Sequence, residues 1–218
     1  MKNVAIIGLS SFGFYLCKSL GELGFDLMAI DVDEELINQV KPFVRKAVVG
    51  DAKDKSFLER LGIEDFDTVI ISVGNKIDVS TLITLYVKEL NVEEIITKAV
   101  NEDHAKILDK IGATKIIFPE RDIAQRMAHT IASPNFLEYI SLTEGFSLIE
   151  IGPSSKWVGK KLKELDLRKI YKVQITMIRE IIPPRVVIPD GEFIIKDSDI
   201  LYIIGSDENI NNLRKSID

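Results

Sequence analysis

The sequence has few of the features on which secreted, membrane-spanning or nucleic-acid-binding proteins depend. Among its 218 residues there is a single cysteine, so no internal disulfide can form, which suits a reducing compartment. No apolar run approaches the ~20 residues needed to cross a bilayer, and no signal-peptide pattern opens the chain. We therefore expect a cytoplasmic protein, and any action at a membrane requires an anchor supplied by another molecule.

Basic charge is also scarce. The formal net charge is -6 and the isoelectric point is about 5.2. Affinity for nucleic acid depends on clustered Lys and Arg side chains that neutralise phosphates, so DNA and RNA are not expected as partners. The 46% hydrophobic content is enough to build a substantial core, in one large domain or two modest ones.

Up to about residue 132, short β-branched runs alternate with segments of helical period. The expected strands lie near 3–7, 26–31, 47–50, 68–73, 94–100 and 115–118, and the expected helices near 12–23, 33–40, 55–61, 78–90, 102–111 and 121–131. This order predicts an α/β fold with a Rossmann-like, doubly wound parallel sheet. In such a sheet, ligands bind in a crevice at the carboxyl ends of the strands.

The rhythm changes around residues 132–135, where a proline ends the last helix, and we expect a domain boundary there (1–132 and 133–218). The second part mixes short strands with two helices, which predicts a small α+β domain. Its expected strands lie near 146–151, 173–178, 186–188 and 201–204, and its helices near 158–165 and 208–216. A domain of this size is close to the lower limit of independent stability, so dimerisation would support it.

The turn after the first strand resembles the glycine-rich turn G-x-G-x-x-G. Gly8 and Gly13 keep the outer positions, and Ser10 replaces the middle glycine. The helix that follows offers unpaired backbone N–H groups and a partial positive charge to a phosphate. Ser10 costs close backbone approach unless its hydroxyl donates to a phosphate oxygen. Taken alone, the spacing fits a phosphate site and a plain strand–helix turn equally well.

Further residues at the ends of the expected strands favour the nucleotide interpretation. Asp31 ends the second strand, where a ribose-binding acid is expected, although an acid there can instead cap the next helix, a role for which Asp33 competes. Lys98 ends the fifth strand and is either a phosphate contact or a solvated lysine. The full set of expected nucleotide contacts is Gly8, Ser10, Ser11, Phe12, Gly13, Asp31, Val32, Asp51, Ala52, Val73, Gly74, Asn75 and Lys98.

A dehydrogenase would also have this fold, but it would need a proton donor in the crevice. The two histidines, His104 and His129, fall on expected helices and are interpreted as packed or solvated side chains. Cys17 lies too far along the first helix to act as a helix-terminal nucleophile and is expected in the core. We therefore expect a protein that is not an enzyme. The alternative interpretations are an NAD-dependent oxidoreductase and a free-standing nucleotide sensor.

Several motifs together resemble one family. They are Gly8-Leu9-Ser10-Ser11-Phe12-Gly13, Ala29-Ile30-Asp31, Gly50-Asp51-Ala52, Lys98-Ala99, Pro119-Glu120-Arg121-Asp122, Trp157-Val158-Gly159-Lys160-Lys161-Leu162, Leu165-Asp166-Leu167-Arg168 and Asp197-Ser198-Asp199-Ile200-Leu201. The chain resembles the RCK (regulator of potassium conductance) family, and more narrowly the cytosolic subunits of Ktr and Trk potassium-uptake systems. The resemblance covers nearly the whole length.

The resemblance implies a regulatory subunit that forms an octameric ring, with itself or a paralogous subunit, beneath a membrane potassium channel or transporter. ATP, ADP, AMP or NAD(H) would bind the first domain and alter the ring. By the same resemblance, Asp51 and Ala52 border the adenine, Lys98 approaches phosphate, and Glu120 helps to hold a divalent cation at a dimer interface. Ktr-type relatives usually carry Gly at Ser10 and Arg at Ser11, so the preferred nucleotide is left open.

In some relatives the second domain binds cyclic di-AMP. Arg168, Ile175 and Pro189 stand where that interpretation needs them, whereas Gln174 departs from the usual Asn. The basic run around these residues also fits an ordinary solvated helix face. Cyclic di-AMP is therefore an expectation from resemblance only.

Overall fold

The computed structural model describes residues 2–131 and 136–217. The chain divides into two compact units, Met1–Glu120 and Arg121–Asp218. This division falls earlier in the chain than the expected boundary near residue 132, and residues 132–135 themselves lie outside the described part. The sixth helix, α6 (Pro119–Ile131), spans the division.

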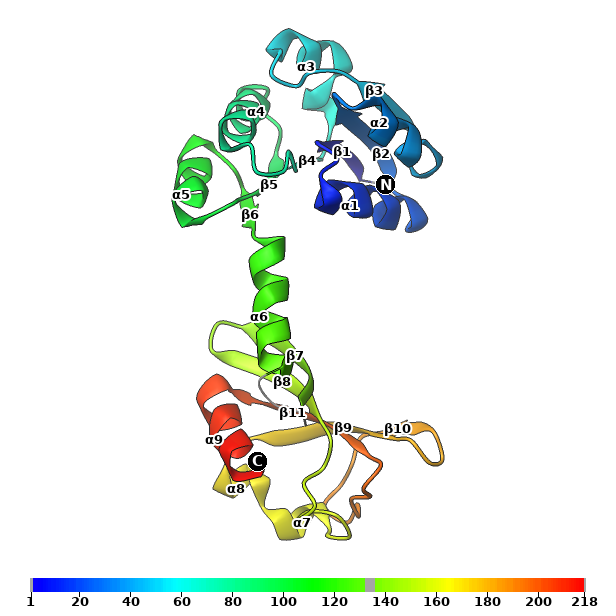
Figure 1. Ribbon diagram of the computed structural model, residues 1–218, viewed down its shortest axis with the longest axis vertical. Helices are drawn as coiled ribbons and strands as arrows, with labels where there is room; N and C mark the ends of the chain where they lie inside the picture. The colour runs from blue at the N-terminus through cyan, green and yellow to red at the C-terminus, as the bar shows by residue number, and fades with distance from the viewer. Residues whose placement is uncertain (1, 132–135, 218) are drawn as a thin grey trace. The chain divides into compact units, whose positions relative to one another are not determined.

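The first unit is built on a six-stranded sheet with the order β3-β2-β1-β4-β5-β6 (Figure 1). Its strands are β1 (Asn3–Ile7), β2 (Asp26–Asp31), β3 (Lys46–Val49), β4 (Thr68–Ile71), β5 (Glu94–Lys98) and β6 (Lys115–Ile117). All neighbouring strands pair in parallel. The strand order reverses at β1 and β4, which places the topological switch point between these two strands.

Helices cover both faces of this sheet. They are α1 (Ser11–Glu22), α2 (Glu34–Val40), α3 (Lys55–Leu61), α4 (Ile77–Glu89) and α5 (Glu102–Ile111), with short 3-10 turns η1 (Lys41–Phe43) and η2 (Ile63–Asp65). Alternate residues of β1 point to opposite faces: Ala5 and Ile7 join a core with α3 and α4, and Val4 and Ile6 join a core with α1 and α2. The expected Rossmann-like architecture is confirmed.

The second unit contains a five-stranded antiparallel sheet with the order β10-β9-β11-β8-β7. Its strands are β7 (Phe136–Thr143), β8 (Phe146–Ile151), β9 (Gln174–Glu180), β10 (Arg185–Val187) and β11 (Ile200–Ser206), and its further helices are α7 (Leu162–Leu165), α8 (Leu167–Ile170) and α9 (Asp207–Ile217). Ile149, Ile203 and Leu213 are fully buried in its core. The expected α+β class is confirmed.

Two details of the second unit differ from the expectation. Strand β7 was not expected; it pairs with β8 through a tight turn at Glu144 and Gly145, where Gly145 has φ 75°. The helix expected over 158–165 is shorter, because Gly159 adopts φ 81° and the helical turn α7 starts only at Leu162.

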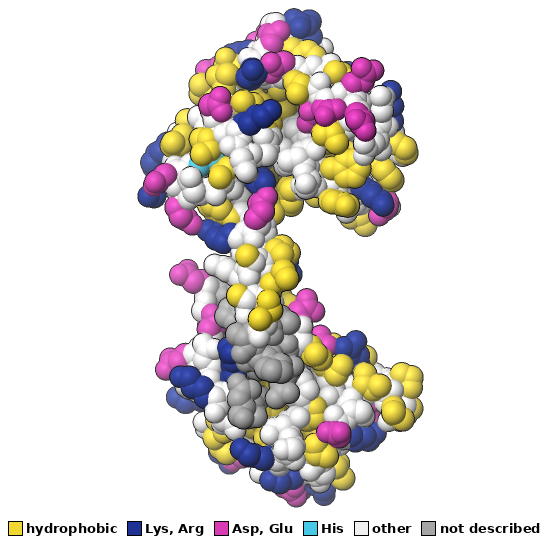
Figure 2. Space-filling model, in the orientation of Figure 1, with side chains coloured by type: hydrophobic (Ala, Val, Ile, Leu, Met, Phe, Trp, Pro, Cys, Tyr) yellow, Lys and Arg dark blue, Asp and Glu magenta, His cyan; other side chains and the backbone are white. Residues whose placement is uncertain are grey.

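Helix length and surface charge bear on two kinds of partner that the composition does not favour, a membrane and nucleic acid. Within residues 2–131 and 136–217, no helix is long and apolar enough to span a bilayer. On the face shown in Figure 2, Lys and Arg side chains are interspersed with Asp and Glu.

Candidate functional site

A cavity of about 520 Å³ opens at the carboxyl ends of β1, β2, β3 and β4. This volume falls within the range of ligand pockets. Its lining consists of Ile7, Gly8, Leu9, Ser10, Ile30, Asp31, Val32, Asp33, Leu36, Gly50, Asp51, Ala52, Lys53, Val73, Gly74, Lys76, Val79 and Ile83. The crevice lies at the switch point of the sheet, where a doubly wound fold binds its ligand.

Two glycines shape the turn above β1. Gly8 has φ 92°, and a Cβ there would lie 2.5 Å from the carbonyl oxygen of Ser72. A Cβ on Gly13 would lie 2.2 Å from the carbonyl oxygen of Gly8. Real Cβ atoms do not approach so closely, so both positions require glycine. Gly8 is therefore fixed by the close approach of the segment after β4, and Gly13 by the packing of α1 against the turn.

The middle position of the motif has a different environment. The Ser10 hydroxyl forms a 2.6 Å hydrogen bond with the hydroxyl of Ser72, which lies just beyond β4 and is fully buried. The Ser10 backbone N–H also donates to the Ser72 carbonyl oxygen at 3.3 Å. The hydroxyl and the N–H group of Ser10 are thus both directed to the residue that follows β4, which holds the turn against the end of the neighbouring strand.

The first turn of α1 leaves backbone donors available. Phe14 N–H donates to the carbonyl oxygen of Ser10 at 2.8 Å, the first hydrogen bond of the helix. The amides of Ser11, Phe12 and Gly13 precede it and have no acceptor within the helix. These three residues begin the helix but do not line the cavity, so their contact with a phosphate stays a prediction.

Asp31 links the ends of two strands. One carboxylate oxygen accepts the backbone N–H of Leu9 at 2.5 Å, and the other accepts the N–H of Asp33 at 2.9 Å. Asp33 caps α2 by accepting the N–H groups of Glu35 and Leu36. The capping role belongs to Asp33, and Asp31 keeps lone pairs for further donors because a carboxylate offers about four acceptor sites.

At the far edge of the crevice, Asp51 and Ala52 follow β3. Asp51 accepts the N–H of Lys53 at 3.0 Å, and its carboxylate lies 3.3 Å from the Lys53 ammonium group. Ala52 is buried, whereas Asp51 is exposed. Both line the cavity with Val32, Val73 and Gly74. The structure therefore brings these expected contacts to one rim.

Besides Ser11, Phe12 and Gly13, the expected contacts Lys98 and Asn75 lie outside this lining, as does Glu120. Lys98 is nearly buried at the end of β5, and its ammonium group donates to the carboxylate of Glu120 at the start of α6. Partial burial acts to raise the pKa of Glu120, but the hydrogen bond from Lys98, a backbone hydrogen bond and the Lys98 charge together hold this pKa below its ordinary value. Asn75 stands in the loop between β4 and α4, next to residues that do line the crevice.

Glu120 alone does not form a metal site in this chain. Its carboxylate already binds an ammonium group, and the described residues contain no group of three His, Cys, Asp or Glu side chains able to hold an ion. A divalent cation here would need ligands from a nucleotide or another subunit. The metal role of Glu120 stays a prediction.

His104 and Cys17 have structural environments. Val100 N–H donates to Nδ1 of His104 at 3.3 Å, so the ring proton lies on Nε2, 2.9 Å from the Ser80 hydroxyl. Burial lowers the pKa of His104 and raises that of Cys17 to about 12. Neither residue lines the crevice. The side chain of His129 lies outside the described residues.

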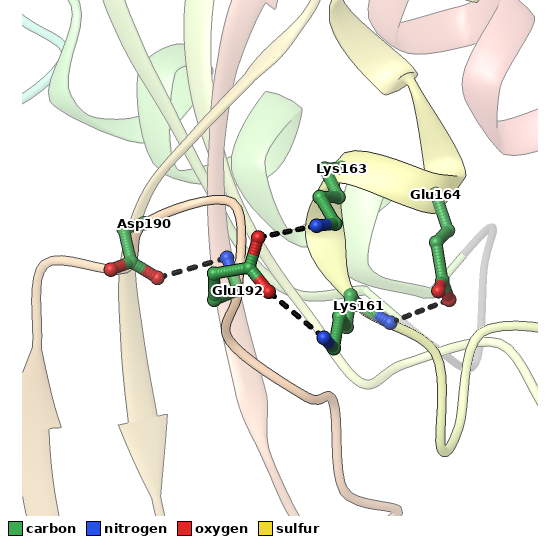
Figure 3. Close-up of polar contacts among 5 residues, drawn as sticks. All are labelled: Lys161, Lys163, Glu164, Asp190 and Glu192. Carbon is green, nitrogen blue, oxygen red and sulfur yellow. Dashed lines mark hydrogen bonds and ion pairs between the residues drawn. The ribbon is translucent and has the colours of Figure 1, made fainter.

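A second cavity of about 330 Å³ lies in the second unit. Arg168, Gln174, Ile175 and Pro189, the residues singled out for cyclic di-AMP, all line it. Two lysines near this cavity are paired with one shared acid. Figure 3 shows Lys161 and Lys163 both bound to the carboxylate of Glu192, the first at 2.9 Å.

Sequence reasoning missed several residues of the first cavity. Leu36, Val79 and Ile83 form apolar walls, and Lys53 and Lys76 add positive charge to the rim. The apolar positions follow the helical period of α2 and α4 and have no separate signal. The two lysines directly follow the turns at the strand ends, and that position in the sequence could have predicted that they line the crevice.

The comparisons with known proteins agree with this geometry. The TrkA-N domain family matches residues 4–119 and the TrkA-C domain family matches residues 146–218. Ktr system potassium uptake protein C of Bacillus subtilis (strain 168) is 43% identical over 219 residues, covering 99% of this chain and 97% of that protein.

Solved structures show the same fold. The GsuK channel superposes with a TM-score of 0.70 at 17% identity, covering 99% of this chain and 39% of that one. A structure of the GsuK channel bound to NAD gives a TM-score of 0.53 at 22% identity, covering 100% and 38%. With both domain families matched and a relative aligned from end to end, this chain belongs to the Ktr family of potassium uptake proteins.

Proposed function

We propose that this chain is the cytoplasmic regulatory subunit of a potassium uptake system, and that it binds an adenine nucleotide or NAD(H) in the crevice of its first unit. The observation that carries the proposal is the cavity at the switch point, bordered by the Gly8 turn and by the Asp31 carboxylate. The full-length relationship to a potassium uptake protein supports the physiological role.

The parts of the crevice match the parts of such a ligand. The turn after β1 and the start of α1 favour phosphate, because backbone N–H groups and the helix dipole gather there. Asp31 at the end of β2 has free lone pairs for ribose hydroxyls. Asp51 and Ala52 beyond β3 border the place left for a base. The similarly folded GsuK channel has a solved structure bound to NAD, a ligand that contains these same parts.

Regulation requires that the ligand discriminate between two arrangements of subunits. A nucleotide that binds one arrangement more tightly shifts the population toward it, by no more than that difference in affinity. We propose that paired subunits assemble into a ring, octameric and with a paralogous subunit where one exists, which passes the shift to the membrane partner.

An exposed apolar stripe supports self-association. Ile123, Met127 and Ile131 recur every fourth residue along α6 and are 48%, 57% and 77% exposed. Residues at this spacing share one helix face. Leaving such a face in water is unfavourable, so a second subunit is its proposed cover.

The test is a titration of the full chain with ATP, ADP, AMP, NAD and NADH, followed by calorimetry and thermal unfolding. We expect at least one compound to raise the melting temperature with a saturable dependence. If none does at saturating concentration, nucleotide sensing is refuted. Steady oxidation or reduction of the nicotinamide with a common alcohol or acid would favour the oxidoreductase instead, and a clean monomer by light scattering would contradict the ring.

The cavity of the second unit supports a second ligand. We propose that it binds cyclic di-AMP, with Arg168 contacting phosphate and Ile175 and Pro189 packing on the bases. The same titration with cyclic di-AMP tests this, using Arg168→Ala as the variant. Equal binding by both proteins would contradict the assignment.

A further inference from the structure

The lining of the nucleotide crevice carries two lysines in different electrostatic situations. The Lys53 ammonium group lies 3.3 Å from the Asp51 carboxylate and is neutralised by it. Lys76 is exposed and, within residues 2–131 and 136–217, has no ion pair. Of the cations that line this crevice in the described part of the chain, Lys76 is therefore the one whose charge remains available.

The lining of the crevice carries more acidic than basic side chains, so an unpaired lysine matters for binding an anion. The lining holds three carboxylates, from Asp31, Asp33 and Asp51, against the two lysines. A phosphorylated ligand is itself anionic and would be repelled by such a lining unless a cation faced its phosphates. Asp31 and Asp33 accept backbone N–H groups, and neither contact brings a cation to the crevice.

The sheet order places Lys76 beside the phosphate turn. Lys76 follows β4, and β4 is the direct neighbour of β1, which leads into the Gly8 turn. The hydrogen bond between Ser10 and Ser72 holds these two loops together. Lys53 follows β3, which β2 separates from β1. Lys76 thus stands at the phosphate end of the crevice and Lys53 at the base end.

The other lysine considered for phosphate binding already has a carboxylate partner. Lys98 is nearly buried, is bound to Glu120 and does not line the crevice. The turn itself contributes Ser10 and Ser11, which are uncharged.

We infer that Lys76 is the residue that recognises phosphate in this crevice, and that it makes affinity rise with the number of phosphates on the ligand. The inference rests on the proposed nucleotide site and adds the group that ranks its ligands. An ammonium group acts as a compact, hydrated point charge, so it responds to total phosphate charge more than to its geometry. Its exposure makes the contact sensitive to ionic strength.

The experiment compares Lys76→Gln, Lys76→Arg and Lys53→Gln with the wild-type chain by calorimetric titration of AMP, ADP and ATP at low and high salt. We expect Lys76→Gln to weaken ATP binding about tenfold and AMP binding about threefold, the scale of a partly screened charge-assisted contact. Lys76→Arg should restore most of the affinity. The ATP-to-AMP affinity ratio should fall in Lys76→Gln and stay at its wild-type value in Lys53→Gln.

The outcomes separate this inference from the proposed function. If the wild-type chain binds nucleotides and Lys76→Gln keeps the wild-type ATP-to-AMP ratio, the role of Lys76 is overturned and the nucleotide site stands. An equal loss of that ratio in Lys53→Gln also overturns it, because the effect would then be general charge. If the wild-type chain binds none of the three, both proposals fail. Melting temperatures without ligand verify that the variants fold.

Discussion

Replacing Asp31 by alanine tests the centre of the proposed site. The Asp31 carboxylate accepts the N–H of Leu9, a residue only 2% exposed, and removing the carboxylate leaves this buried donor unpaired. An unsatisfied buried N–H costs about 1–3 kcal/mol. The second donor, Asp33 N–H, is exposed and regains a hydrogen bond from water. The unfolding free energy should fall by about 1–3 kcal/mol, and the melting temperature by roughly 2–4 °C for each kcal/mol lost.

The same substitution removes the contact proposed for the ribose hydroxyls. A hydrogen bond to a charged group contributes about 1.5–3 kcal/mol, which corresponds to a roughly 10- to 150-fold loss of affinity. A nucleotide at 100 times its dissociation constant stabilises the wild-type chain by about 2.7 kcal/mol. At the same concentration the Asp31→Ala variant should gain only about 0.3–1.4 kcal/mol.

Thermal unfolding with and without nucleotide measures both effects. The matched control is Asp26→Ala, since Asp26 begins the strand that Asp31 ends and pairs with the exposed Arg45. This control should cost at most about 1 kcal/mol and keep the full stabilisation by nucleotide. The reasoning is refuted if Asp31→Ala melts like the wild-type chain and responds equally to nucleotide.

Three further predictions concern a buried histidine, the glycine turn and self-association. Burial lowers the pKa of His104, so the folded state favours the neutral ring, and stability should be full above about pH 6.5 and fall as the pH drops further. The His104→Gln variant should show a flatter dependence of melting temperature on pH, and parallel curves for the two proteins would contradict this. Gly13→Ala places a Cβ 2.2 Å from the Gly8 carbonyl oxygen, so it should lower the unfolding free energy by about 1–3 kcal/mol and abolish nucleotide binding in calorimetry. The control Gly152→Ala, whose Cβ would have no neighbour within 4 Å, should change neither. Met127→Glu should lower the mass measured by light scattering without changing the fold, and an unchanged mass would exclude the α6 stripe as a subunit contact.

The fold of the first unit was largely predictable from the sequence. Local signals agree with the final structure there: α3 and α5 have the expected bounds, and both end at glycines in the left-handed conformation, Gly62 and Gly112. Strand β7 escaped prediction because its exposed edge positions break the alternation of apolar and polar residues that marks a half-buried strand. The turn at Gly145 was the signal that could have found it.

The site was predictable in its outline and not in its internal contacts. Strand ends are visible in the sequence, and they bring Gly8, Asp31 and Asp51 to one rim. The bond between Ser10 and Ser72 joins residues 62 positions apart, and no spacing rule predicts such a pair. For the same reason, the pairing of Lys98 with Glu120 became apparent only in three dimensions.

The burial of Cys17 has a practical consequence. It is the sole cysteine of the sequence, and its thiol is fully buried with a pKa raised to about 12, so almost no thiolate forms near neutral pH. The natural chain therefore behaves as a cysteine-free background toward maleimide dyes and spin labels. A single engineered surface cysteine in each unit would carry a probe pair, and spectroscopy could follow ligand-driven rearrangement without first mutating the core.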